Sequence, residues 1–217
     1  MGVFKQIVKW LAVLVLVNPA GAQEGFDLQG QRSLLSLNGG FSIPVMSYGS
    51  SNIKNRMAGF AKPDFMADLN YVYLLGANQG ITGSVFYGAN KAGINTVQSA
   101  SLQDGYRFFG LLAGPFITKH FLSRWDADFK LLAGVSRVMR PHLEYNEEII
   151  LSQNKATSFT WGGGLAIRYQ LSGRSFLRLA ADHLNLNPQY SGKEGETTRP
   201  EQVIVVMNVQ AGIGFKF

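Results

Sequence analysis

Apolar and polar residues alternate along most of the chain with a period of two, which is typical of β-strands with one apolar face. The last segment shows this most clearly, because every odd position from Val203 to Phe217 is apolar. Asn208, Gln210 and Lys216 lie among the residues between them. We therefore predict a final strand whose odd-numbered side chains share one face.

Seven further segments carry the same alternation and are also predicted strands. They are residues 34–43, 65–74, 81–90, 106–118, 125–135, 159–170 and 176–185. Each has roughly 10 to 13 residues, which exceeds the usual strand length and matches the 9 to 11 residues that cross a bilayer at a tilt. Residues 106–118 are apolar on both faces, so the register of this strand stays ambiguous.

The connections between these segments alternate in length. Residues 76–79, 122–124 and 172–174 are tight turns rich in Gly, Asn and Ser, whereas residues 45–64, 91–105, 141–158 and 188–202 are long and polar. This alternation predicts antiparallel hairpins with short turns at one end and long loops at the other.

The first 22 residues have the pattern of a cleaved secretory signal peptide. Lys5 and Lys9 precede an apolar run at residues 10–17, and small residues at Ala20 and Ala22 follow. The alternative is a membrane anchor, but eight apolar residues rise only about 12 Å as a helix. We expect a mature chain of residues 23–217 forming one domain, with a formal charge lowered from +6 to +4 by the loss of two Lys.

Composition narrows the class of protein. Hydrophobic residues make up 46% of the chain and charged residues only 16%, below the roughly 25% of soluble domains. The chain has no Cys, which excludes disulfides, thiolate metal sites, thiol catalysis and lipoprotein acylation. No segment after residue 22 is a candidate transmembrane helix.

These observations predict an all-β fold, an eight-stranded antiparallel up-and-down transmembrane β-barrel. Aromatic residues near predicted strand ends would form the interfacial girdles. They are Tyr71, Tyr73, Tyr87, Trp125, Phe159, Trp161, Tyr169, Phe215 and Phe217. The alternative is a soluble lipocalin-like or streptavidin-like barrel with its apolar face inward. Long strands, low charge and the terminal Phe217 favour the membrane.

Four segments resemble the small outer-membrane β-barrels with an OmpA-like transmembrane domain, in their porin-like form. They are LNGGFSIP at 37–44, LLAGP at 111–115, WGGGLAIRY at 161–169 and VQAGIGFKF at 209–217. The resemblance is architectural and spans nearly all of the predicted mature chain. We do not expect the cell-wall tethering of the full-length namesake, because the last predicted strand reaches Phe217.

The resemblance implies export to the outer membrane of a Gram-negative bacterium, where the N-terminus and short turns face the periplasm. Val209, Ile213, Phe215 and Phe217 would form the C-terminal signal that the barrel-insertion machinery reads. We expect a monomer in contact with outer-membrane lipid and lipopolysaccharide, with a structural or surface-interaction role. A narrow porin for small solutes or ions and a lipid-modifying enzyme are the two alternatives.

On the polar face, eight charged residues are predicted to point into the barrel. They are Asp68, Asp126, Asp128, Lys130, Arg168, Arg178, Asp182 and Lys216. Eight strands enclose a space just wide enough for side chains, and an unpaired buried charge is costly. We therefore expect a structural network of ion pairs, with a narrow, gated or water-lined ion path as the alternative.

The sequence offers little for catalysis, metals or cofactors, and we expect none of them. His183 and Asp182 are adjacent on one strand and so face opposite ways, and the His-x-Ser of lipid A deacylase barrels would here be His183 and Asn185. Glu144, Glu147 and Glu148 are candidate ligands for a divalent ion, or else an ordinary acidic loop. Despite a pI near 9.6, the basic residues are scattered, which favours lipid head groups over nucleic acid.

Overall fold

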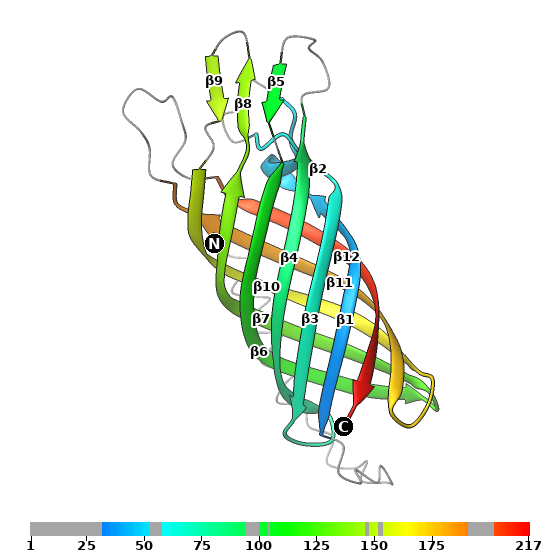
Figure 1. Ribbon diagram of the computed structural model, residues 1–217. Coiled ribbons are helices and arrows are strands. Elements are labelled where there is room, and N and C mark those ends of the chain that lie inside the picture. The colour runs from blue at the N-terminus through cyan, green and yellow to red at the C-terminus, as the bar shows by residue number, and fades with distance from the viewer. Residues whose placement is uncertain are drawn as a thin grey trace, which may run out of the picture.

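Eight long strands, one for each alternating segment of the sequence, form the barrel in the computed structural model (Figure 1). The structure describes residues 32–52, 58–93, 100–103, 105–145, 148–151, 154–190 and 202–217. The barrel strands are β1 (Ser33–Pro44), β3 (Asp64–Leu74), β4 (Gln79–Ala92), β6 (Tyr106–Leu122), β7 (Trp125–Arg140), β10 (Asn154–Gln170), β11 (Ser175–Pro188) and β12 (Ile204–Lys216). The predicted fold class is confirmed, and the predicted signal peptide lies outside the described residues.

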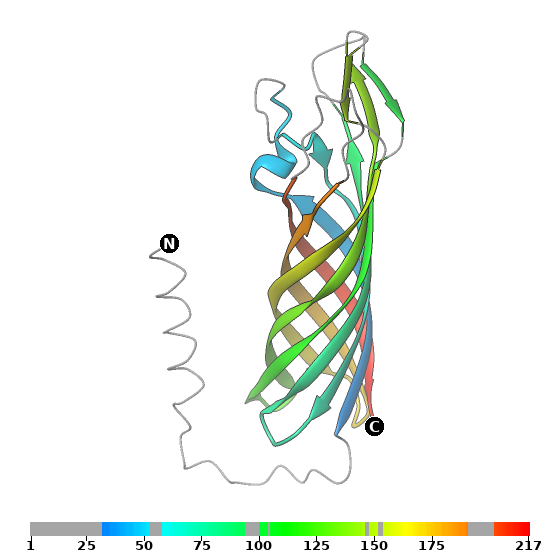
Figure 2. The same cartoon turned by 90° about the vertical axis from the view of Figure 1, so that its left-hand side faces the viewer.

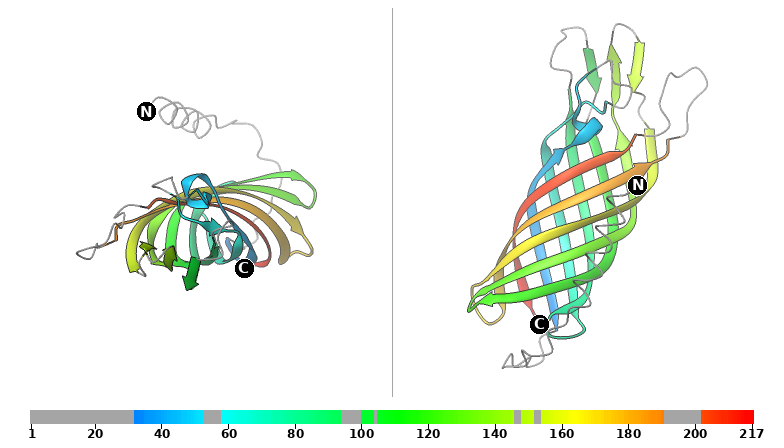
Figure 3. Two further views of the ribbon diagram at one scale, coloured as in Figure 1. Left: turned by 90° about the horizontal axis from the view of Figure 1, so that it is seen from above. Right: turned by 180° about the vertical axis from the view of Figure 1, so that it is seen from behind.

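Each strand pairs antiparallel with its sequence neighbours, and β1 pairs with β12 to close the sheet (Figure 3). Closure leaves the eight strands without a free edge, which hydrocarbon requires because it offers no partner for an open N–H or C=O group. The closing pair continues past β12, since the backbone N–H groups of Ser33 and Phe217 each donate to the other residue's carbonyl, at 2.9 and 3.0 Å.

Three tight turns lie at the end of the barrel where β1 begins and β12 ends (Figure 2). Ser123 and Arg124 alone connect β6 to β7, and the pairing shifts by one residue between His120 and Leu122. In the turn between β10 and β11, Ser172 N–H donates to the carbonyl of Ser175 at 3.2 Å. The predicted alternation of short turns and long connections is therefore present.

The opposite end of the barrel carries short elements that the sequence pattern does not predict. They are the 3-10 helix η1 (Met46–Gly49), β2 (Ala61–Lys62), β5 (Ala100–Gln103), β8 (His142–Tyr145) and β9 (Glu148–Leu151). β5, β8 and β9 form a separate three-stranded sheet beyond the barrel (Figure 1). β7 and β10 also extend further toward this end than predicted, so part of residues 141–158 is strand and not loop.

Burial alternates along every barrel strand, which separates a lumen face from an outer face. In β6, whose register the sequence leaves ambiguous, Tyr106, Phe108 and Leu112 are buried, whereas Phe109 and Leu111 are exposed. Strands of 11 to 17 residues are long enough to cross a bilayer at a tilt. Among the described residues, no helix is long and apolar enough to span a membrane.

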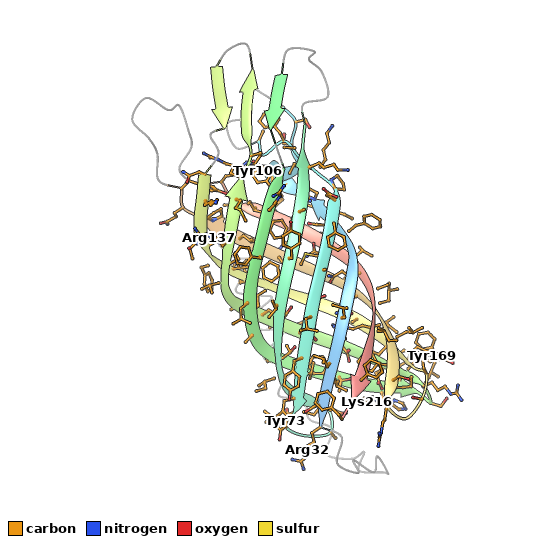
Figure 4. The ribbon with its side chains drawn as sticks, viewed as in Figure 1. Arg32, Tyr73, Tyr106, Arg137, Tyr169 and Lys216 are labelled. Atoms are coloured by element: carbon orange, nitrogen blue, oxygen red, sulfur yellow. The ribbon has the colours of Figure 1, made fainter. Side chains whose placement is uncertain are left out.

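The outer face is a continuous apolar surface. Leu37, Leu69, Leu111, Val135 and Leu165 on neighbouring strands are each 44% exposed or more. Aromatic residues gather near both ends of this surface: Phe41, Phe65, Tyr87, Phe109 and Phe159 toward the loops, and Tyr71, Tyr73, Trp125, Phe215 and Phe217 toward the short turns. Figure 4 shows Tyr73 and Tyr169 near the short turns.

Candidate functional site

The lumen holds the charges that the alternation assigns to the polar face. Asp68, Asp126, Asp128, Lys130, Arg168, Arg178 and Asp182 are each 6% exposed or less. Lys216 lies at the short-turn end of the lumen, where its side chain is 18% exposed (Figure 4). The eight residues form two groups at different heights, and the four acidic and four basic side chains balance in formal charge.

The first group lies near the short turns and is centred on Arg168. Its guanidinium makes two bonds to one carboxylate, from Nε to Asp128 Oδ2 at 2.7 Å and from Nη2 to Asp128 Oδ1 at 2.9 Å. Arg168 Nη2 also lies 3.5 Å from Asp126 Oδ2. This two-pronged geometry is the strong form of an Arg–carboxylate pair, and the register makes it possible because Arg168 on β10 is directly opposite Asp126 on β7.

Uncharged and half-buried side chains complete the first group. Thr118 Oγ1 donates to Asp128 Oδ1 at 2.9 Å and accepts from Arg168 Nη2 at 2.8 Å. Gln170 Nε2 donates to Asp126 Oδ2 at 2.6 Å, and His120 Nδ1 lies 2.8 Å from Asp126 Oδ1. Every carboxylate oxygen of Asp126 and Asp128 therefore has a partner, which offsets the cost of burying the two charges.

The second group lies near the middle of the barrel and contains Lys130, Asp182, Asp68 and Arg178. Lys130 Nζ lies 3.0 Å from Asp182 Oδ2. Asp68 Oδ2 accepts a hydrogen bond from Ser84 Oγ at 3.3 Å. The second oxygens of Asp68 and Asp182 accept no hydrogen bond from the described residues. Both carboxylates line a small cavity with room for about one water molecule, so the geometry suits a hydrated site.

Arg178 differs from Arg168 in its partners. It lies directly opposite Arg168 in the pairing of β10 with β11, a like-charge arrangement that is destabilising unless neighbours compensate. Its Nη1 is 3.3 Å from Asn70 Oδ1 and 3.4 Å from Ser36 Oγ, so neutral oxygens hold it away from the Asp126–Asp128 side. The paired carboxylates around Arg168 offset the repulsion between the two guanidinium groups.

Two glycines make room inside the barrel. A Cβ on Gly164 would collide with the carboxylate of Asp182 and lie 3.1 Å from Lys130 Cε. A Cβ on Gly88 would collide with the ring of Phe108. Glycine therefore stands in β10 and β4 where a neighbour's side chain crosses the lumen.

Above the charges, toward the loops, the lumen is mainly apolar, with the buried hydroxyl groups of Ser136 and Thr160 bonded to each other among the apolar side chains. The side chains that fill it include Met66, Phe86, Phe108, Leu112, Leu132, Leu184, Leu186, Ile204 and Val206, each 6% exposed or less. The rings of Phe86 and Phe108 lie 6.3 Å apart. A second, smaller apolar cluster of Leu34, Val72, Leu74, Phe116 and Phe176 lies beside the first group of charges toward the short-turn end, where the ring centre of Phe176 is 5.3 Å from the Arg168 guanidinium carbon.

A polar and aromatic cap lies at the loop end of the lumen. Tyr48 of η1 packs edge-on against Tyr106, with ring centroids 5.0 Å apart, and its hydroxyl donates to Asn90 Oδ1 at 3.2 Å. The Arg140 guanidinium lies 4.4 Å from the ring centre of Tyr190. Burial raises the pKa of Tyr48 and of Tyr190 well above the ordinary value of a phenol.

Sequence reasoning missed the neutral members of this lumen. Thr118, Gln170, Asn70 and Ser36 bond to the charges, and their positions depend on cross-strand register rather than on alternation alone. The structure also brings His120, near the end of β6, to Asp126. The available signal is that Thr118 and Gln170 are polar residues in step with the polar face of their strands.

The residues of the predicted C-terminal signal lie on the outer face of β12 and just beyond it. Val209, Ile213, Phe215 and Phe217 are 46% to 57% exposed. The ring of Phe217 lies 6.4 Å from that of Tyr71 on β3. They form an apolar strip beside the closing pair of strands.

The weaker candidates of the sequence are dispersed. His183 lies on the outer face beside Trp161, with ring centroids 6.1 Å apart, whereas Asp182 faces the lumen. The side chains of His142, Glu144, Glu147 and Glu148 lie outside the described residues. Within the part of the chain that the structure describes, no group of three or more His, Asp or Glu side chains could hold a metal ion.

Comparisons with known proteins agree on the fold. No protein-family model and no curated sequence matches the chain. The structure of Neisserial surface protein A matches with a TM-score of 0.55 at 13% identity, over 85% of this chain and 97% of that one. The attachment invasion locus protein Ail of Yersinia pestis matches with a TM-score of 0.50 at 16% identity, over 86% and 99%.

At these identities the likeness extends to the fold. The resemblance in the sequence motifs and the match of the whole barrel lead to the same architecture. The chain has the eight-stranded barrel fold of small outer-membrane proteins.

Proposed function

We propose that this protein is a monomeric barrel of the Gram-negative outer membrane that serves as a closed, non-enzymatic scaffold for its long loops. The observation that carries the proposal is the contrast between its two faces. The outer face carries an apolar band on every strand, which suits lipid, whereas buried side chains occupy the lumen at every level of the barrel.

The outer face supports a membrane location. A soluble barrel of the lipocalin type would place its apolar face inward, yet the buried face here contains Asp126, Asp128, Arg168 and Arg178. Exposed apolar patches larger than a few hundred Å² are rare on soluble monomers. Aromatic residues near both ends of the strands match the two interfaces of a bilayer.

The lumen supports a scaffold rather than a pore. A continuous water path would have to pass the apolar layer that contains Phe86, Phe108, Leu112 and Leu132. Below that layer, Arg168 of β10 binds Asp128 of the neighbouring strand β7 inside the lumen, with bonds of 2.7 and 2.9 Å. An ion would find few open ligands on such a route, because six of the eight oxygens of the lumen carboxylates already have a partner.

Fractionation tests the membrane location. The folded protein should co-fractionate with outer membrane, and boiled and unboiled samples should migrate differently on SDS gels. A soluble periplasmic protein without a heat shift would end the membrane proposal.

Conductance in planar bilayers tests the closed lumen. The folded barrel should give no discrete channels. The double variant Phe86→Ala/Phe108→Ala removes two adjacent rings from the apolar layer and is the matched control, since it should admit water and small ions. Discrete channels in the unaltered protein would instead favour the narrow porin.

A further inference from the structure

We infer that the outer face carries a binding site for a phosphate-bearing lipid head group, formed by Lys91, Arg107, Arg137 and Lys155. We call these four residues the basic sector. All four are exposed. Lys91, Arg107 and Arg137 are each flanked along the strand by residues buried in the lumen, and Lys155 is followed by the buried Ala156, so all four face outward. The inference rests on the proposed membrane location and adds the ligand class.

The register brings the basic sector together. Its residues lie on the consecutive neighbours β4, β6, β7 and β10. Arg107 on β6 and Lys155 on β10 are both directly opposite Met139 of β7. Arg137, two residues from Met139, is the diagonal neighbour of both, and Lys91 is the diagonal neighbour of Arg107 across Ala89. Diagonal neighbours in a sheet lie roughly 7–8 Å apart, a spacing that one phosphate group can bridge through flexible side chains.

The position of the basic sector along the barrel axis favours a lipid head group over a soluble anion as its ligand. Moving toward the barrel centre on the same strands, the next large outward side chains are Tyr87, Phe109, Val135 and Phe159, which are 42% to 59% exposed. Phe109 is directly opposite Arg137. The cations therefore lie at the loop-side border of the apolar band, where head-group phosphates lie above acyl chains. Figure 4 shows Arg137 toward the loop end of the barrel.

The basic sector lies on one side of the barrel. On the other four strands, outward positions near the loop end are occupied by Phe41 and Ile43 of β1, Phe65 of β3, Asn187 of β11 and Met207 of β12, none of which is charged. General attraction to an anionic membrane would not require all four cations to lie on four consecutive strands of the eight. Clustered like charges repel one another, and a shared phosphate relieves that repulsion while accepting charge-assisted bonds from the arginines.

The test compares two triple variants that remove equal charge. Lys91→Gln/Arg137→Gln/Lys155→Gln alters the basic sector and leaves Arg107 in place. Lys119→Gln/Arg124→Gln/Arg174→Gln is the control, because these exposed cations lie at the short-turn end, outside the lumen network. Each protein is folded into phosphatidylcholine vesicles containing diphosphoryl lipid A or its dephosphorylated form, and retained lipid is counted by native mass spectrometry.

The unaltered protein should retain diphosphoryl lipid A and not the dephosphorylated form. The sector variant should lose affinity by about 100-fold, at roughly fivefold per cation near the head groups, and the control should stay within about twofold. The single variant Arg137→Gln should lose about fivefold in affinity for diphosphoryl lipid A. It tests the inference even where the triple variant folds poorly. Equal losses in both triple variants, retention of both lipids, or displacement by inorganic phosphate at low concentration would overturn the inference. A barrel that shows no heat shift in any vesicle would instead refute the membrane proposal.

Discussion

From the short turns to the middle of the barrel the lumen contains the buried charges beside a small apolar cluster, whereas nearer the loops it is filled mainly by apolar side chains. Arg168 and Asp128 represent the charged half, and Leu112 and Phe108 represent the apolar half. Below the basic sector the outer face shows no such division, because lipid imposes one requirement over the height of the apolar band. The lumen meets no lipid, so its filling need only pack without voids and leave no charge unpaired.

The two halves hold together by different forces. The apolar half gains stability from close contact between side chains. When one of these side chains is truncated, the loss in the free energy of unfolding increases with the volume removed. The charged half gains stability only when every partner is present, because removing one member of a buried ion pair leaves the other charge buried and unpaired. The charged half should therefore be the more sensitive to single substitutions, although it need not contribute more to stability as a whole.

The largest expected effect follows from Arg168→Met, which leaves Asp126 and Asp128 without their main cation. Breaking a buried pair by removing one partner typically costs about 3–5 kcal/mol. We expect a loss of this size in the free energy of unfolding. Urea unfolding of the vesicle-embedded barrel, followed by tryptophan fluorescence, measures it.

Two further variants separate charge from packing in this experiment. Arg174→Met removes a cation from an exposed turn and should change the free energy of unfolding by less than about 0.5 kcal/mol. Adding Asp128→Asn to Arg168→Met should recover part of the lost free energy of unfolding, because one of the two unpaired carboxylates is replaced by a neutral amide. If Arg168→Met and Arg174→Met unfold at the same urea concentration, the charged half does not depend on pairing.

A smaller effect distinguishes the two faces of β6 in the apolar half. Leu112 is 1% exposed in the lumen, and its neighbour Leu111 is 58% exposed on the outer face. Truncating either to Ala loses the same transfer free energy, but only Leu112→Ala leaves a cavity, since lipid chains can follow the surface at position 111. We expect Leu112→Ala to cost about 1–3 kcal/mol more than Leu111→Ala, measured by the same urea unfolding. Equal losses would mean that the apolar half is loosely packed.

This pair of residues also marks the limit of prediction from the sequence. Alternation identified the strands, and it assigned Asp126, Asp128 and Arg168 to one face, because a polar residue at every second position contrasts with apolar neighbours. In β6 both faces are apolar where the strand passes the apolar half, so a period of two carries no information there. The sequence therefore predicted the barrel well and the apolar half poorly.

The partners of the charges depend on register, which alternation does not specify. The two-residue turn places Leu122 opposite Trp125, but the shift between Leu122 and His120 places Thr118 opposite Asp128. Without that irregularity the pairing would move by one residue and put Thr118 on the other face. No residue pattern near His120 predicts this register shift, so alternation alone does not predict Thr118 and His120 as members of the network.

The smallest expected effect concerns the cap that closes the apolar half at the loop end. Burial raises the pKa of Tyr48 and Tyr190 above the value of about 10 that a phenol has in the unfolded chain. Above that pH the unfolded chain binds fewer protons than the folded one, so the free energy of unfolding falls as pH rises. The stabilisation is fully present below pH of about 10 and is lost as pH rises toward the raised pKa values.

Ultraviolet titration of phenolate in the folded barrel should therefore leave these two phenols protonated at pH values where the unfolded chain has ionised them, until the cap opens. Tyr48→Phe/Tyr190→Phe keeps both rings and removes both titrating groups, so its urea midpoint should fall less steeply with alkaline pH. The charged half should be unaffected in the same variant, because the apolar layer separates it from the cap. An equal pH dependence in the variant and the unaltered protein would show that alkaline loss of stability does not begin at these two phenols.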